Sequence, residues 1–207
     1  MQEILKYFHT ISDVQKAQFA ALFALYTDWN AKINVISRRD IENLYVHHVL
    51  HSLAIAQVIN FKDNTQILDV GTGGGFPGIP LAIFFQNVNF TLIDSVGKKV
   101  KVATEIAKSL EIKNVKIKQL RAEEERGKFD FVVSRAVMPL ADLVKIIKKN
   151  ISKEQKNALP NGLICLKGGE LAHEILPFKN IAETYQISDF FKEEYFKTKK
   201  IVFLPIN

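Results

Sequence analysis

The spacing of hydrophobic residues divides the chain into a helical first part and a second part of a different texture. In the first 60 residues, apolar side chains recur at helical spacing after Ser12, which fits a capping box with Gln15. They recur again after Asp40, which we expect to cap a second long helix. The polar run at 62–64 breaks the pattern. We therefore predict a helical cap over residues 1–62 and a separate architecture over residues 63–207.

From residue 66 onward, short apolar runs alternate with segments of helical spacing. The predicted strands are 67–70, 90–94, 115–118, 129–133 and 163–166. The predicted helices lie near 78–86, 97–110, 139–149 and 170–176. Two last strand-like runs, 183–190 and 200–204, are too close together to contain a crossover helix. The pattern predicts an α/β fold whose mostly parallel sheet ends in an antiparallel hairpin.

The most informative segment follows the first predicted strand, which ends at Asp69. Five glycines lie between Gly71 and Gly78, and a helix is expected to begin near Pro77 or Pro80. Glycine is needed where the backbone takes a positive φ or approaches a ligand closely. The amino terminus of the following helix offers free N–H groups and a positive dipole end. The segment is therefore a candidate nucleotide-cofactor loop at the carboxyl end of a strand.

The spacing of the glycines narrows the choice of cofactor. A phosphate-binding Walker loop is excluded, because Ile79 follows Gly78 where that motif needs lysine. A dinucleotide fingerprint that starts at Gly71 fails at Phe76, although Gly73-x-Gly75-x-x-Gly78 satisfies the bare pattern and keeps NAD or FAD as an alternative. An acid two residues before the first glycine suits S-adenosylmethionine better, because this cofactor carries a cationic amino group and a sulfonium.

Two further acids follow the next predicted strands. Asp94 lies 23 residues after Gly71, about where an adenosine ribose is bound by a carboxylate. Its alternative role is to cap the helix at 97–110. Ala122-Glu123 follows the third strand, where Glu123 either faces an adenine or belongs to a solvated acidic cluster. Acids at three successive strand ends around one glycine loop predict a cofactor site more strongly than any one of them alone.

The composition of the chain limits the classes of protein to which it can belong. With 207 residues, 47% of them hydrophobic, the chain fits one ordinary globular domain. A single cysteine, Cys165, excludes a disulfide framework and is expected to be a small core residue. We find no signal-peptide pattern and no apolar run of the roughly 18 residues that a membrane span needs, so we expect a cytoplasmic protein without membrane contact.

The positive charge of the chain is concentrated in one stretch. The net charge is +6, and residues 97–121 alone hold eight Lys or Arg against two acids. Such a stretch is either a surface for a polyanion such as RNA or a solvated helix face. The candidate RNA-contacting residues are Lys98, Lys99 and Lys101, followed by Arg38 and Arg39.

At this point the motifs resemble a known family. The segment Asp69-Val70-Gly71-Thr72-Gly73-Gly74-Gly75-Phe76-Pro77-Gly78-Ile79-Pro80 looks like the cofactor loop of the bacterial guanine-N7 methyltransferases of small-subunit ribosomal RNA, also called glucose-inhibited division protein B. Three further segments agree in the family's order: 29–34 (WNAKIN), 92–99 (LIDSVGKK) and 133–136 (VSRA).

The resemblance implies a Rossmann-like class I methyltransferase with a seven-stranded sheet and a helical cap. It also implies that S-adenosylmethionine contacts Gly71, Phe76, Ala122, Glu123 and Arg135, with Asp94 at the ribose. The residue analysis adds Asp69 and Gly73 to the candidate cofactor site. The implied reaction is methylation of N7 of one guanine in 16S ribosomal RNA, with that RNA or the small subunit as partner. We predict no metal and no protein partner, and we expect a monomer.

The segment 47–52 departs from the family pattern. The family commonly shows Arg-His-x-x-Asp-Ser, whereas this chain has His47 and His51 at the first and fifth positions. Only His48 and Ser52 match, and we expect His48 to contact RNA or to pack at the junction of cap and sheet. A metal at His47 and His51 is not predicted, because no carboxylate or further ligand is placed nearby.

The implied chemistry needs no general base. Guanine N7 has an exposed lone pair and no proton, so it attacks the methyl carbon directly, and we name no catalytic residue. Phe76 either stacks on the target base or covers the cofactor. Two other functions stay open: a non-catalytic RNA-binding or ribosome-assembly protein with a vestigial cofactor loop, and an NAD-linked oxidoreductase.

Overall fold

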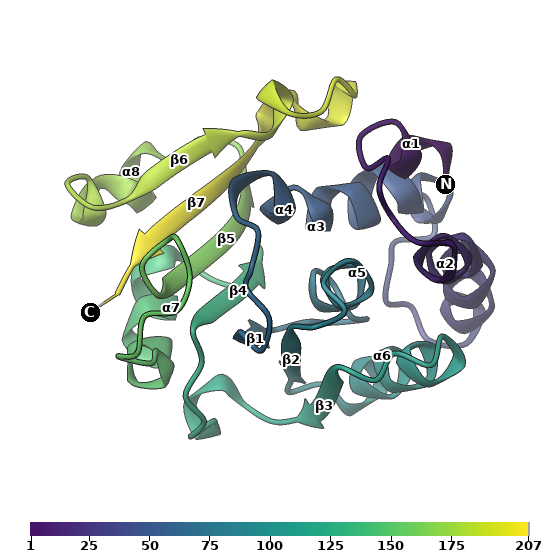
Figure 1. The fold of residues 1–207 in the computed structure, drawn as a ribbon, viewed down its shortest axis with the longest axis horizontal. Helices are drawn as coiled ribbons and strands as arrows, with labels where there is room; N and C mark the ends of the chain where they lie inside the picture. The colour runs from purple at the N-terminus through teal and green to yellow at the C-terminus, as the bar shows by residue number, and fades with distance from the viewer. Residues whose placement is uncertain (207) are drawn as a thin grey trace.

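A single seven-stranded sheet forms the centre of the computed structural model, which describes residues 1–206 (Figure 1). The strand order is β3-β2-β1-β4-β5-β7-β6. The bounds are β1 (Gln66–Val70), β2 (Asn89–Asp94), β3 (Val115–Gln119), β4 (Phe131–Arg135), β5 (Gly162–Gly168), β6 (Glu183–Gln186) and β7 (Lys199–Pro205). Strands β1 to β5 pair in parallel, and β7 is antiparallel to both β5 and β6. The predicted α/β sheet with an antiparallel end is confirmed.

Helices cover both faces of this sheet. On one side lie α2 (Asp13–Lys32), α5 (Gly78–Phe84) and α6 (Gly97–Ser109), and on the other side lies α7 (Leu140–Ile147) (Figure 1). The shorter helices are α1 (Gln2–Leu5), α3 (His51–Leu53), α4 (Ile55–Val58) and α8 (Ala172–Ile175). The remaining turns are η1 (Ile41–Asn43), η2 (Leu44–Leu50), η3 (Ala122–Glu124), η4 (Lys148–Asn150), η5 (Leu176–Phe178), η6 (Ile187–Asp189) and η7 (Glu194–Thr198).

The cap differs from the prediction in its second helix. The predicted capping box at the start of α2 is confirmed: the Ser12 hydroxyl accepts the Gln15 N–H, and the Gln15 side chain accepts the Ser12 N–H. The helical stretch expected after Asp40 is present over residues 41–58, but it is not one regular α-helix: 3-10 (η1) and π-helical (η2) turns precede α3 and α4. The expected cap at Asp40 is wrong. The Asp40 side chain makes no cap hydrogen bond and instead contacts His47 and His48.

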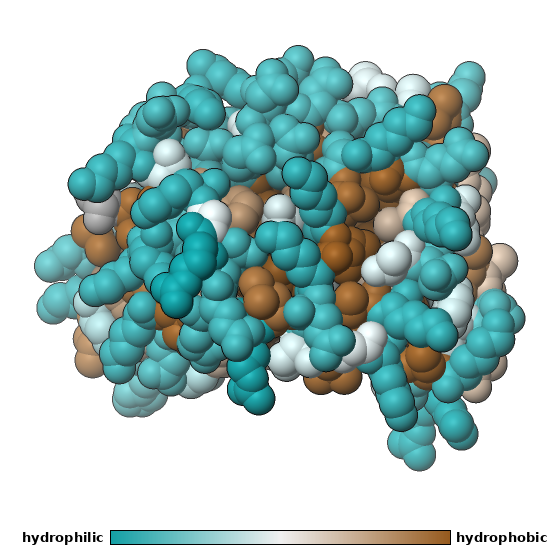
Figure 2. Space-filling view, turned by 90° about the horizontal axis from the view of Figure 1, so that it is seen from below, coloured by the Kyte–Doolittle hydropathy of each residue, from teal (hydrophilic) through white to brown (hydrophobic). Residues whose placement is uncertain are grey.

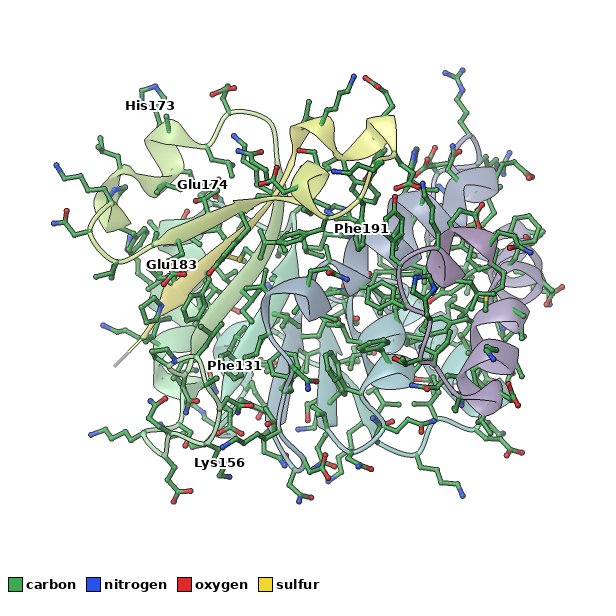
Figure 3. The ribbon with its side chains drawn as sticks, turned by 45° about the horizontal axis from the view of Figure 1, so that its top comes forward. Phe131, Lys156, His173, Glu174, Glu183 and Phe191 are labelled. Carbon is green, nitrogen blue, oxygen red and sulfur yellow. The ribbon has the colours of Figure 1, made fainter. Side chains whose placement is uncertain are left out.

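One hydrophobic cluster joins the cap to the sheet. It contains buried side chains from α2, η2, α5, α6 and the inner strands, so the cap shares its core with the sheet. Phe191, in the connection between β6 and β7, contacts the rings of Tyr7 and Phe8 near α1 (Figure 3). Cys165 is buried on β5, as predicted. No helix within residues 1–206 has the length and apolarity to cross a bilayer.

Candidate functional site

A pocket of about 470 Å³ opens at the carboxyl ends of the parallel strands. It lies where open α/β sheets bind ligands, and its volume is in the usual range for a small-molecule site. The predicted site residues that line it are Gly71, Asp94, Ala122, Glu123 and Arg135. They come from the ends of β1, β2 and β4 and from the connection after β3. The fold therefore brings these five residues, separated by up to 64 positions, around one cavity.

The loop after β1 turns at Gly71 in a conformation that favours glycine. This residue has φ +69°, and a Cβ placed on it would lie 2.5 Å from Cγ2 of Val137. Val137 follows β4 and lines the same pocket, with 38% of its surface exposed. The preceding Ala136 also has a positive φ, +51°. Backbone from β1 and an apolar side chain from after β4 therefore meet at the pocket wall.

Two carboxylates take the N–H groups of the glycine loop. Asp69 Oδ2 accepts the Thr72 hydroxyl at 2.6 Å and the Gly78 N–H at 2.8 Å. Asp94 Oδ2 accepts the Gly73 N–H, and its Oδ1 accepts the Val96 N–H, each at 2.8 Å. The expectation of free N–H groups at the start of α5 is therefore wrong for Gly78. The Gly73 and Gly78 N–H groups are therefore not free to bind a pyrophosphate.

Burial sets the charge state of the first of these acids. Asp69 is fully buried, and this burial raises its pKa to about 7, although the bonds from Thr72 and Gly78 favour the ionised form. Neither Asp69 nor Gly73 lines the pocket. Their role in this structure is to fix the loop, which in turn presents Gly71. Asp94 closes the turn before α6 by accepting the Val96 N–H and also lines the pocket, but α6 has no side-chain cap hydrogen bond, so the expected helix cap is wrong. Its contact with the ribose stays a prediction.

Phe76 lies in the core and not on the pocket wall. Its ring is 3% exposed, packs 4.8 Å from the ring of Tyr26 and carries the Arg135 guanidinium 5.1 Å from its centroid. The expectation that this ring offers a surface to a base or covers the cofactor is therefore corrected: protein atoms already cover it.

The cap contacts the glycine loop at a point that sequence reasoning missed. The Tyr26 hydroxyl donates to the Gly74 carbonyl at 2.8 Å. The Asn30 side chain accepts the N–H groups of Val35 and Ile36, which fixes the segment after α2 and sets Val35 against Gly74. The only signal for this contact was the segment 29–34, which the resemblance singled out without a stated role.

Arg135 is held from the cap side of the pocket. Its guanidinium donates to the His47 carbonyl at 3.3 Å and to His48 Nδ1 at 3.0 Å. Within residues 1–206, no carboxylate lies within 4.0 Å of it. His48 Nε2 lies 2.8 Å from the Asp40 carboxylate. Because arginine only donates, Nδ1 is the acceptor and Nε2 carries the proton. His48 is therefore engaged at both ring nitrogens and packs at the junction of cap and sheet, as one of its two predicted roles required, and its contact with RNA stays a prediction.

The three histidines of this segment have different surroundings. Burial, followed by the nearby charge of Arg135, lowers the pKa of His48 to about 4. The same two causes hold the pKa of His51 well below its usual range. His51 Nδ1 is 3.4 Å from the Tyr195 hydroxyl, and its buried Nε2 has no partner. His47 stacks on the Tyr195 ring at 3.8 Å. His48 and His51 are therefore neutral at pH 7.

The predicted basic residues lie in two places, on α6 and in the segment after α2. Lys99 lines the pocket, whereas Lys98 and Lys101 are exposed on α6. Arg38 and Arg39 are exposed in the segment after α2. The side that carries α6 and β3 is largely hydrophilic (Figure 2). A larger groove of about 610 Å³ between α2 and α6 contains none of the predicted site residues.

Comparison with known proteins gives one consistent family. Residues 15–201 match the family described as rRNA small subunit methyltransferase G (GidB). The chain is 67% identical to the protein of that name from Phocaeicola vulgatus, over 100% of this chain and 99% of that protein. It is 65% identical to the one from Bacteroides thetaiotaomicron, over the full length of both.

Solved structures share the fold. A SAM-dependent methyltransferase from Aquifex aeolicus superposes with a TM-score of 0.59 at 18% identity, over 83% of this chain and all of that one. The fibrillarin/Nop5p complex gives a TM-score of 0.55 at 10% identity, over 74% of this chain and 79% of that one. At these identities the likeness concerns the fold.

The buried neutral histidines predict a loss of stability in acid. A histidine whose pKa is lowered by folding binds its proton more readily in the unfolded chain, so stability falls as the pH drops below about 6.5. Replacing His51 with Asn removes one such group. We expect the free energy of unfolding of this variant, measured by urea titration between pH 5 and 7.5, to depend less on pH, by up to about 1.4 kcal/mol per pH unit.

The control for this measurement is His173→Asn, at an exposed position that projects outward from α8 (Figure 3). This variant should keep the pH dependence of the unmodified chain. An unchanged slope in the His51 variant would show that His51 is not held neutral by burial.

Proposed function

Because the chain belongs to the rRNA small subunit methyltransferase G family, we propose that it transfers a methyl group from S-adenosylmethionine to N7 of one guanine in 16S ribosomal RNA. The observation that carries the proposal is the single pocket lined by Gly71, Asp94, Glu123 and Arg135. Its side chains offer carboxylates for the hydroxyls and the amino group of the cofactor and a guanidinium for its carboxylate.

Each of these groups has a defined task in binding. The Gly71 backbone forms a wall that leaves room for the ligand, since a side chain there would meet Val137. Asp94, held by two backbone N–H groups, retains lone pairs for the ribose hydroxyls. Ala122 and Glu123 lie at the adenine end, and Arg135 faces the pocket from β4. The structure's donors and acceptors therefore fit S-adenosylmethionine.

The reaction depends on positioning. Bound S-adenosylmethionine supplies an electrophilic methyl group on a sulfonium. Val137 and Met138 add apolar surface to the pocket wall after β4. Because N7 has no proton to lose, the chain has to hold the guanine in line with the methyl group and needs no base. The pocket residues therefore contribute to the reaction through their shape and electrostatic complementarity to the cofactor and the guanine.

The guanine must reach the pocket unpaired. In A-form RNA the groove that exposes N7 is too narrow for side chains, so a target base has to lie in a loop or swing out of its stack. We propose that the exposed residues Lys98, Lys101, Arg38 and Arg39 contact the RNA backbone. Lys99 lines the pocket itself.

The glycine loop argues against the NAD alternative. Pyrophosphate binding needs open N–H groups at the helix start, and the Gly73 and Gly78 N–H groups are already bonded to Asp94 and Asp69. A methyl-transfer assay distinguishes the enzyme from the non-catalytic alternative. An assembly factor with a vestigial loop would bind no S-adenosylmethionine or would bind it without transferring the methyl group.

The direct test uses cells that lack this protein. We expect mass spectrometry of their 16S ribosomal RNA to show the loss of one N7-methylguanosine, because the methyl group on that guanine is the product of the proposed reaction. Expression of the unmodified chain should restore it. An unchanged modification map would contradict the proposed substrate.

A matched pair of glycine variants tests the cofactor site. Gly71→Ala and Gly169→Ala both place alanine at a positive φ, so both lose about 1 kcal/mol of stability. Only at Gly71 does the new methyl group meet Val137 and the pocket; at Gly169 nothing lies within 4 Å. We expect calorimetry to show S-adenosylmethionine binding weakened by about tenfold or more in Gly71→Ala, which is about 1.4 kcal/mol. Equal affinity of both variants for S-adenosylmethionine would contradict the assignment of Gly71 to the cofactor site.

A triple charge reversal tests the RNA surface. Replacing Lys98, Lys99 and Lys101 with Glu should weaken binding of a 16S RNA fragment and lower the salt slope, log Kd against log salt, by about 2. The control reverses three exposed lysines elsewhere in the sequence, namely Lys153, Lys156 and Lys179, so that the net charge is the same. If both triple variants bind alike, the stretch 97–121 is a solvated face.

A further inference from the structure

Three side chains form a connected path from the cap to the pocket. The Asp40 carboxylate lies 2.8 Å from His48 Nε2, and His48 Nδ1 lies 3.0 Å from the Arg135 guanidinium. Asp40 and His48 come from the segment after α2, and Arg135 ends β4 on the pocket wall. The cap therefore reaches the pocket through this path as well as through the contacts of Tyr26 and Val35 with Gly74.

His48 itself is fixed from several sides. Its ring lies 5.2 Å from the Phe76 ring and is 12% exposed, and its carbonyl accepts the Ser52 hydroxyl at 2.6 Å. The Asp40 carboxylate is shared with His47, so it is held at both oxygens. The imidazole has little freedom to turn, and its Nδ1 lone pair keeps one direction toward Arg135.

This arrangement orients Arg135 without cancelling its charge. Its two hydrogen-bond acceptors, the His48 ring and the His47 carbonyl, are uncharged. A carboxylate in the place of His48 would hold the guanidinium equally well but would also neutralise it. A half-buried guanidinium without an adjacent carboxylate attracts an anion, because desolvated charges are normally paired. The side of Arg135 that faces the pocket is available to such an anion.

We propose that Asp40 and His48 are positioning residues that hold Arg135 through a neutral imidazole, so that its full charge binds an anionic group of a ligand, a carboxylate or a phosphate. The inference rests on the proposed function, because the cofactor brings a carboxylate and the RNA brings phosphates. It adds two residues of the cap to the binding machinery of the pocket.

The test compares substitutions that keep different atoms of His48. In His48→Asn the amide oxygen replaces Nδ1 and retains the acceptor for Arg135. In His48→Gln the amide group replaces Nε2 and retains only the contact with Asp40, and His48→Ala removes both. Asp40→Ala, at a partly exposed site, removes the far end of the path with little risk of unfolding. His173→Ala on exposed α8 is the control.

Two probes identify the anion. S-adenosylhomocysteine and its carboxamide differ only in the charge of the carboxyl group, and their dissociation constants are measured by calorimetry. A 16S RNA fragment provides the phosphate probe. If the carboxylate is bound, the unmodified chain prefers S-adenosylhomocysteine by about tenfold or more, and His48→Ala and His48→Gln lose this preference while His48→Asn keeps most of it. Asp40→Ala should lose part of it.

If the anion is a phosphate, the preference for S-adenosylhomocysteine stays unchanged, and the affinity for the RNA fragment follows the same order of variants. Either pattern supports the inference. It is overturned if His48→Gln and His48→Ala keep the affinities of the unmodified chain for both probes, or if His48→Asn loses as much as His48→Ala. Failure of the unmodified chain to bind S-adenosylhomocysteine would instead count against the proposed function, and the RNA arm would then decide the inference.

Discussion

The site depends on the satisfaction of backbone donors in a loop that turns sharply at the end of β1. Such a loop cannot form regular hydrogen bonds, so its N–H groups need partners from elsewhere. Asp69 and Asp94 supply them, by accepting the N–H groups of Gly78 and Gly73. With the loop fixed in this way, the Gly71 backbone forms part of the pocket wall. The same bonds leave these N–H groups not free to bind a pyrophosphate, which favours a cofactor without phosphates.

The second constraint comes from the cap. Its residues share the main hydrophobic cluster with the sheet, so the cap packs in a defined orientation on α5 and α6. That orientation brings Tyr26 to Gly74 and His48 to Arg135, while Arg135 lies over the Phe76 ring. A segment that reads as a separate helical unit thus contributes to the electrostatics of the pocket. Burial keeps His48 neutral, so the His48 ring binds Arg135 without adding a negative charge beside it.

Much of this molecule could be predicted from local patterns. The strands of the sheet, the helices that connect them and the capping box of α2 follow from hydrophobic periodicity and turn residues. The predicted strand 183–190 was too long, because η6 follows β6 at Ile187. The helix expected after Asp40 is present but irregular, because residues 41–58 combine 3-10, π- and α-helical turns. Its expected cap failed for a tertiary reason: the Asp40 carboxylate bonds to His47 and His48.

The sequence by itself determined that acids and glycines stand at the ends of successive strands, since each such position is a matter of local spacing. This spacing predicted that the glycine loop, Asp94 and Glu123 belong to one site, and the family resemblance added Arg135. Only the tertiary structure decided which side chains face the cavity. Phe76 and Asp69 belong to the same strand and loop as Gly71, yet both are buried: Phe76 packs against Tyr26 of the cap, and Asp69 accepts the Gly78 N–H. Burial and pairing are set by neighbours far along the chain, and no local pattern encodes them.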